Sequence, residues 1–321
     1  MKLTFKHTAL SLALAGSFTL TGCNFIGSGD PVFVEPTPVE QVAVSGTAVK
    51  GVLANAIVKA FTLSAPTVDL LADQGIRTNT DGSYTFDLEG VNEPVIVEIE
   101  ADADTTMVCD SASGCGDVQS GGTVSNLTGL KLSTVAFVEA GSTTVSAPVN
   151  TMTSIAADIV KASGTQNLSQ TQLKAKLQKD VLDLVGLDDG EQAQIDLFSD
   201  ALIDATNNSL GNSTANDVVK KLSAINGALS AFQSGENVGT KISTFVATVA
   251  AATKAATPEA IKAAVDAADV VIKKTVAEAV KVAENAGVTT PIVVQPPKVT
   301  LPGGGVVTGG TGGTGASGAD S

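Results

Sequence analysis

Short apolar runs alternate with polar residues between residues 42 and 148, and the pattern changes beyond that point. The runs are rich in β-branched residues and are separated by turn-forming residues, as is typical of strands in a sheet or sandwich. Strands are predicted at residues 42–49, 56–63, 83–88, 94–101, 130–138 and 143–147. From about Asn150 apolar residues recur every three or four positions, which indicates helices.

The helical part begins near Asn150 and continues to about residue 286. Ser169 is suited to cap a helix that ends near Gly186, and its predicted apolar stripe is Leu173, Leu177, Val181, Leu184 and Val185. Further helices are expected at about 189–206, 214–233, 237–255 and 258–286. The last opens with Thr257-Pro258-Glu259, a cap followed by a first-turn proline and an acid.

These patterns predict an α+β protein with two domains. The first is an all-β, sandwich-like domain over residues 42–148, and the second is an α-helical bundle over residues 149–286. Residues 23–41 contain glycines, prolines and acids, so they are predicted to be an extended tether. Residues 287–321 are rich in proline, glycine and threonine, so they are predicted to be a disordered tail.

The first 22 residues have the features of an export signal. Lys2, Lys6 and His7 form a positive leader, and residues 9–18 form an apolar run too short to cross a membrane as a helix. The run ends in Leu20-Thr21-Gly22-Cys23, which resembles the lipobox of bacterial lipoproteins. This resemblance implies cleavage before Cys23 and attachment of acyl chains to that cysteine, which would anchor the protein to a membrane.

The residue after the modified cysteine bears on the destination. In lipoproteins of Gram-negative bacteria an aspartate at that place commonly marks retention in the inner membrane, whereas this chain has Asn24. We therefore expect a lipid-anchored protein of the outer membrane, on its periplasmic or surface face, in preference to the inner membrane. An ordinary secretory signal with a chance cysteine is the alternative.

Two segments of the β part carry a second resemblance. Residues 44–58 read Val-Ser-Gly-Thr-Ala-Val-Lys-Gly-Val-Leu-Ala-Asn-Ala-Ile-Val, and residues 78–86 read Thr-Asn-Thr-Asp-Gly-Ser-Tyr-Thr-Phe. Together they resemble the carboxypeptidase-regulatory, transthyretin-like β-module of secreted bacterial proteins. Asp81-Gly82 is expected to supply the positive φ angles of a tight hairpin turn, and Tyr84 and Phe86 are expected to point to one face of the next strand.

Composition and charge limit the chemistry of the mature chain. The full chain has a net charge of −14, and removal of residues 1–22 takes away two lysines and no acid, which leaves −16. Such a chain, with Arg77 as its only arginine, cannot build the basic surface that nucleic acid requires. The only histidine, His7, leaves with the signal, so the mature chain has no imidazole for a catalytic triad or a zinc site.

Two cysteines remain once Cys23 is lipidated. Cys109 and Cys115 are close in sequence, and an even pair in an oxidising compartment predicts a disulfide that acts as a local staple. A redox or metal site is the alternative, although the spacing differs from that of known dithiol motifs.

Four acids alternate along one predicted strand and the residues after it. Their side chains should share a face, which could bind calcium, or they could form a solvated sheet face; the four are Glu98, Glu100, Asp102 and Asp104. The solvated face is the preferred interpretation, and no metal or cofactor is predicted.

The last helix has a narrow apolar stripe that is rich in small residues. It is predicted to be a seam of the bundle, and the alternatives are a slot for a lipid-like ligand or a face that meets a membrane or a partner helix. The stripe consists of Ile261, Val265, Ala268, Ile272, Val276, Ala279 and Ala283.

These observations predict a non-enzymatic, lipid-anchored envelope protein that presents an interaction module to an envelope or surface partner. One alternative is an accessory lipoprotein that binds a lipid or hydrocarbon for transport through an outer-membrane transporter. Another is an enzyme that uses only carboxylates, as glycoside hydrolases can. The expected partners are thus the membrane through Cys23, an envelope protein and, in the second hypothesis, a hydrophobic ligand.

Overall fold

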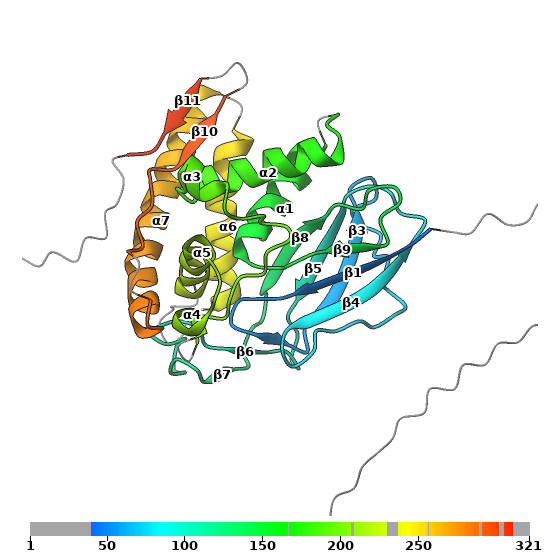
Figure 1. Cartoon of the computed structure of the whole chain (residues 1–321), viewed down its shortest axis with the longest axis horizontal. Coiled ribbons are helices and arrows are strands. Elements are labelled where there is room, and N and C mark those ends of the chain that lie inside the picture. The colour runs from blue at the N-terminus through cyan, green and yellow to red at the C-terminus, as the bar shows by residue number, and fades with distance from the viewer. Residues whose placement is uncertain are drawn as a thin grey trace, which may run out of the picture. The chain divides into compact units, whose positions relative to one another are not determined.

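The computed structural model describes residues 40–165, 167–206, 209–229, 237–255, 257–288, 291–301 and 305–310. The chain divides into two units, Met1–Pro38 and Val39–Ser321. The first unit, which includes the predicted signal, Cys23 and most of the tether, lies outside the described residues. The second unit has a β region at its start and a helical region after it (Figure 1), so the predicted fold class is confirmed.

The β region contains three small sheets. Their strand orders are β4-β1-β9, β3-β5-β8 and β2-β6-β7, and β1 and β9 are parallel whereas the other neighbours are antiparallel. The strands are β1 (Gln41–Thr47), β2 (Leu53–Ala54), β3 (Ile57–Thr62), β4 (Ser83–Glu89), β5 (Val95–Glu100), β6 (Thr106–Val108), β7 (Thr123–Val124), β8 (Lys131–Ala136) and β9 (Thr144–Ser146).

Burial along the strands reveals the layers. In β4 buried and exposed residues alternate, so Tyr84, Phe86 and Leu88 face the core and the other face meets solvent. In β8 every residue after Lys131 is buried, and β5 is nearly as buried. The reason is that β3-β5-β8 lies between the β4-β1-β9 sheet and the helices (Figure 1), with α1 packed against β8.

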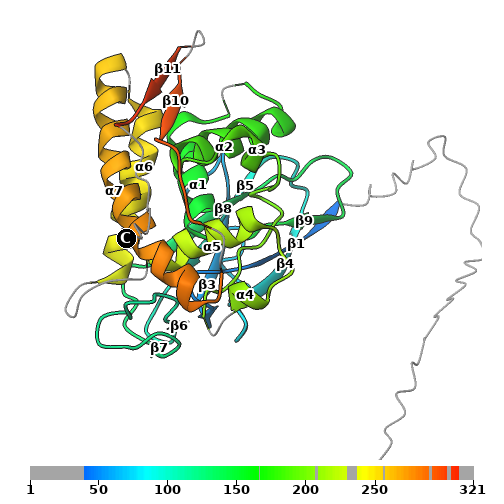
Figure 2. The same ribbon diagram turned by 60° about the vertical axis from the view of Figure 1, so that its left-hand side comes forward.

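Among the described residues, the helical region contains five helices of 12 or more residues and two helices of four residues. They are α1 (Thr151–Ser163), α2 (Gln170–Leu184), α3 (Asp189–Gln192), α4 (Ser209–Asn212), α5 (Asp217–Ala228), α6 (Val238–Lys254) and α7 (Pro258–Asn285). Ser169 caps α2, and Thr257 caps α7 with Pro258 in its first turn, both as predicted. Helix α1 packs on α2 and α6, and α7 packs on α5 and α6 (Figure 2).

One predicted helix, residues 189–206, is wrong for most of its length. Only Asp189–Gln192 is helical, and the chain then runs irregularly to residue 206. Aspartate side chains accept the backbone N–H groups there: Asp196 accepts from Phe198, and Asp200 accepts from Asp196. Such local bonds offer the backbone an alternative to a helix.

The predicted turn at Asp81-Gly82 also needs correction. Gly82 has a positive φ of 76°, but Asp81 does not, and its carboxylate instead accepts bonds from the N–H and hydroxyl of Ser83. The turn does not join paired strands either, because β4 pairs with β1. The prediction that Tyr84 and Phe86 share a face is confirmed, and their rings stack with centroids 6.2 Å apart.

The segment after α7 differs from the predicted disordered tail. Residues 291–297 run back along the helices, and β10 (Lys298–Thr300) pairs with β11 (Val306–Thr308) next to α7 and α2. Ile292 and Val294 are buried, and Gln295 donates its N–H to the carbonyl of Gly186 at 2.7 Å. Two buried apolar residues at alternate positions and a backbone hydrogen bond thus hold a segment whose composition suggested disorder. Residues 311–321 lie outside the described residues.

Candidate functional site

The predicted lipidation residue, Cys23, lies outside the described residues, so the sites below all belong to the second unit. No helix among its described residues combines the length and apolar character needed to cross a bilayer. The same residues contain no group of three or more His, Cys, Asp or Glu side chains placed to hold a metal ion.

A disulfide joins Cys109 and Cys115 at the predicted positions, with their Cα atoms 5.7 Å apart. Both residues are buried, and Cys109 donates its N–H to the carbonyl of Gly122 at 2.8 Å. The loop also contacts α7, because the N–H of Ser113 donates to Glu278 at 3.0 Å. The bridge thus holds a loop of the β region against the last long helix.

The four predicted acids do not form one cluster. Glu98 pairs with Lys131 and Lys161, and Glu100 pairs with Lys59 and Lys131. Hydrogen bonds from Lys59 are the main reason that the pKa of Glu100 lies below its usual range. The pairs with Lys59 and Lys131 join neighbouring strands, and the pair with Lys161 reaches α1. The side chains of Glu98 and Glu100 are only 15% and 26% exposed, so they form ion pairs at the border between the sheet and α1.

The remaining two acids lie in the turn after β5. Asp102 forms a two-pronged pair with Arg77 at 2.5 and 3.3 Å, and this bond holds the pKa of Asp102 well below its usual range. Asp104 donates its N–H to the carboxylate of Asp102. Asp102 therefore organises the turn, and its partners differ from those of Glu98 and Glu100.

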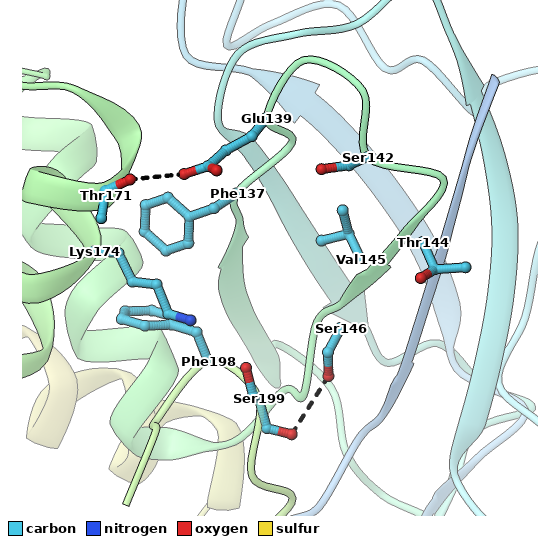
Figure 3. A pocket seen from close by; sticks show the side chains of 10 residues that line it. All are labelled: Phe137, Glu139, Ser142, Thr144, Val145, Ser146, Thr171, Lys174, Phe198 and Ser199. Carbon is cyan, nitrogen blue, oxygen red and sulfur yellow. Dashed lines mark hydrogen bonds between the residues drawn. The ribbon is translucent and has the colours of Figure 1, made fainter. Parts of the chain in front are cut away.

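A cavity of about 350 Å³ lies where the segment from β8 to β9 meets α2 and the irregular stretch after α3 (Figure 3). Phe137 and Phe198 meet there edge to face, with centroids 5.0 Å apart. Most of the other lining groups are polar, and several are already paired: Thr171 donates to Glu139 at 2.9 Å. The lining residues are Phe137, Glu139, Ser142, Thr144, Val145, Ser146, Thr171, Lys174, Phe198 and Ser199.

A buried ion pair of the β region also contacts the helical region. Lys50 lies in the turn between β1 and β2, its side chain is fully buried, and its Nζ is 3.4 Å from Oδ1 of Asp110. The same Nζ donates to the carbonyl of Asn226, in α5, at 2.6 Å. The other carboxylate oxygen of Asp110, Oδ2, accepts a hydrogen bond from the N–H of Gly51 at 2.7 Å.

Neighbouring groups complete this site. Asn226 donates its side-chain N–H to the carbonyl of Val49 at 2.9 Å and accepts from the hydroxyl of Thr151 at 2.8 Å. Gly51 has a φ of 53°, and a Cβ there would lie 1.7 Å from the carbonyl oxygen of Val108, so only glycine fits. The turn, the start of α1 and the end of α5 are thus held together by polar contacts inside the core.

Burial also changes the acid–base properties of the groups. Burial is the main cause that lowers the pKa of Lys50, against the opposing effect of Asp110. The pKa of Asp204 is raised, mainly by burial, and its carboxyl interacts electrostatically with both Asp110 and Lys50. The Lys50 amine and the Asp110 carboxyl group are therefore buried together, and Lys241 and Asp204 also interact electrostatically with Lys50.

No sequence pattern predicts this site. Lys50 lies within residues 44–58, the segment that resembles the β-module, and that resemblance implies no role for it. The sequence does contain a sign of a buried charge, because Lys50 is the one charged residue in the otherwise apolar segment 48–53. Its partners lie 60 and 176 positions further along the chain, and no local pattern connects residues so far apart.

Comparisons of the chain with models of known protein families, with curated protein sequences and with solved structures found no match.

Proposed function

We propose that the chain is a non-enzymatic lipoprotein of the bacterial cell envelope, anchored through acyl chains on Cys23, which presents its β and helical regions to an envelope or surface protein. The observation that carries the proposal is the segment Leu20-Thr21-Gly22-Cys23, placed directly after a positive leader and a short apolar run. Two or more acyl chains provide stable anchoring, since each buried methylene contributes about 0.8 kcal/mol.

The burial of the α7 stripe favours this function over transport of a hydrophobic compound. All seven stripe residues are buried, and α5 and α6 pack against the helix that carries them. A seam filled in this way leaves no slot for an acyl chain. The cavity of Figure 3, at about 350 Å³, is lined mainly by hydroxyl and charged groups, which suit a polar group of a partner better than a hydrocarbon.

The anchor is tested by expressing the full chain in a Gram-negative host supplied with an alkyne-tagged fatty acid. We expect the tag on the membrane-bound protein and an N-terminal peptide that begins with acylated Cys23. Cys23→Ser should remove the tag, whereas the matched control, Cys109→Ser with Cys115→Ser, should keep it. A wild-type protein that is cut elsewhere and released untagged would overturn the proposal.

The membrane of destination is tested with Asn24→Asp, which alters only the residue after the anchor. The wild type should sediment with outer-membrane vesicles, and the variant should move to the inner-membrane fraction. A wild type already in the inner membrane would contradict the proposed location.

The alternative, a carrier of lipid or hydrocarbon, is tested by native mass spectrometry of the secreted mature chain without its anchor. We expect the mass of the polypeptide alone, lighter by two hydrogens for the Cys109–Cys115 bridge. A stoichiometric apolar adduct that is lost on unfolding would make the carrier the better account.

A further inference from the structure

Lys50 and Asp110 bring a primary amine and a carboxyl group together in a place that water does not reach. Their side chains are 0% and 1% exposed, and Asn226, on the other side of the amine, is also buried. Burial of two opposite charges costs several kcal/mol per ion before their attraction is counted. A covalent amide between the two groups would remove both charges and keep the contact.

We propose that Lys50 and Asp110 become joined by an isopeptide bond between Nζ of the lysine and Cγ of the aspartate. The neutral amine attacks Cγ, a new C–N bond forms, one C–O bond of the carboxyl group breaks, and one molecule of water leaves. Nothing is oxidised or reduced, so the reaction needs no cofactor.

The surroundings of the amine suit this reaction. A desolvated lysine has a lowered pKa and a larger neutral fraction, which makes it a nucleophile, and burial acts on Lys50 in this direction. The carbonyls of Asn226 and Gly227 lie 2.6 and 3.5 Å from Nζ. They accept hydrogen bonds from Nζ and so hold it beside the carboxyl group. The amide product retains one N–H, which can still donate to Asn226.

The surroundings of the carboxyl group suit it too. The N–H of Gly51 donates to Oδ2 of Asp110 at 2.7 Å, and negative charge would develop on this oxygen as the amine adds. A backbone donor that is already in place stabilises such a charge, as oxyanion holes do. Gly51 has a positive φ of 53°, and a side chain there would collide with the carbonyl of Val108, so the donor depends on glycine at this position.

The proton transfers can take place within the pair itself. Nζ of Lys50 lies 3.4 Å from Oδ1 of Asp110, so a proton lost by the attacking nitrogen can pass to the oxygen that departs as water.

The test is peptide mapping of the full chain after extraction from the membrane. We expect a branched peptide in which the Lys50 and Asp110 segments are linked, with a combined mass lower by one water and no tryptic cleavage after Lys50. Loss of water within the Asp110 peptide alone would indicate a cyclic imide and would overturn the proposal. So would recovery of the two peptides separately from folded, disulfide-bonded protein.

Two variants and an internal control sharpen the result. Lys50→Arg keeps the positive charge but should give no branched peptide. Asp110→Asn should still form the link, with loss of ammonia in place of water. The exposed pair Lys59 and Glu100 should remain unlinked, and a linked peptide there would mean that sample handling causes the loss of water.

Discussion

The β region and the helical region are held together in different ways. In the β region the ion pairs and the Lys50 site connect different strands or loops, and a disulfide closes the loop between β6 and β7. On α2 and α7 the ion pairs mostly join residues three or four positions apart on the same helix, such as Lys262 with Asp266. The β region thus depends on a few specific connections, whereas the helices depend on a continuous seam of small apolar residues.

The largest loss of stability is expected from a substitution in the β3-β5-β8 sheet, which is covered on both faces. Ile99 lies in β5 between Val58 and Leu132 on the adjacent strands and is 1% exposed. Ile99→Ala should lower the free energy of unfolding by about 3 kcal/mol, because a strand covered on both faces cannot close the cavity. Urea unfolding measures this. Val68→Ala, at a valine that is 57% exposed, serves as the control and should change stability by less than about 0.5 kcal/mol.

The disulfide should come next. Replacing both Cys109 and Cys115 by alanine should cost about 2 kcal/mol, since a short loop restricts the unfolded chain only modestly. Thermal unfolding with and without reductant checks this: reductant should lower the midpoint of the wild type and leave that of the variant unchanged. A reductant effect in the variant would mean that the difference comes from elsewhere.

The Arg77–Asp102 pair should have a smaller effect that depends on pH. Both side chains are about one-third exposed, so Asp102→Asn should cost about 0.5 kcal/mol at neutral pH. The pKa of Asp102 is lowered by folding. Its contribution is therefore complete above the unfolded value of about 3.9 and is lost as the pH falls below it. Stability curves of wild type and variant should converge in acid, and a constant gap would contradict the assignment.

The smallest effect is expected on the surface of α7. Lys262 and Asp266 are each about half exposed, and the lysine precedes the acid, which is the less favourable order for a helix. Lys262→Gln should therefore change the free energy of unfolding by no more than about 0.5 kcal/mol. If it cost as much as loss of the disulfide, the contrast between the two regions would fail.

The sequence predicted the long elements well because their periodicity reports burial directly. Strand limits such as 83–88 against Ser83–Glu89 agree closely, and the caps at Ser169 and Thr257 were found at the expected places. Strands β2, β6 and β7 have two or three residues each, which is too short for a period to appear. The irregular stretch after α3 was missed because its aspartates bind backbone groups while its apolar spacing still resembles a helix.

The candidate sites also differ in how far they could be predicted from the sequence. Cys109 and Cys115 are near neighbours in sequence, so their pairing could be predicted from spacing and compartment. The Lys50 site depends on residues drawn from a turn, a loop and α5, and only the folded chain brings them together. The alternating positions of Glu98, Glu100 and Asp102 predicted that the three side chains share one face of a strand. The strand ends at Glu100, so the alternation does not extend to Asp102.

The return of residues 291–297 along the helices has a consequence for the order in which the chain folds. A chain that emerges from its N-terminus can form the strands early, but Gly186 must wait for Gln295 before their backbones can meet. More than a hundred residues separate the two, so this contact closes a long loop, and such non-local contacts are slow to form. A chain cut short just after α7 would lack Ile292 and Val294, whose side chains are buried, and would expose to solvent the apolar surface that they cover.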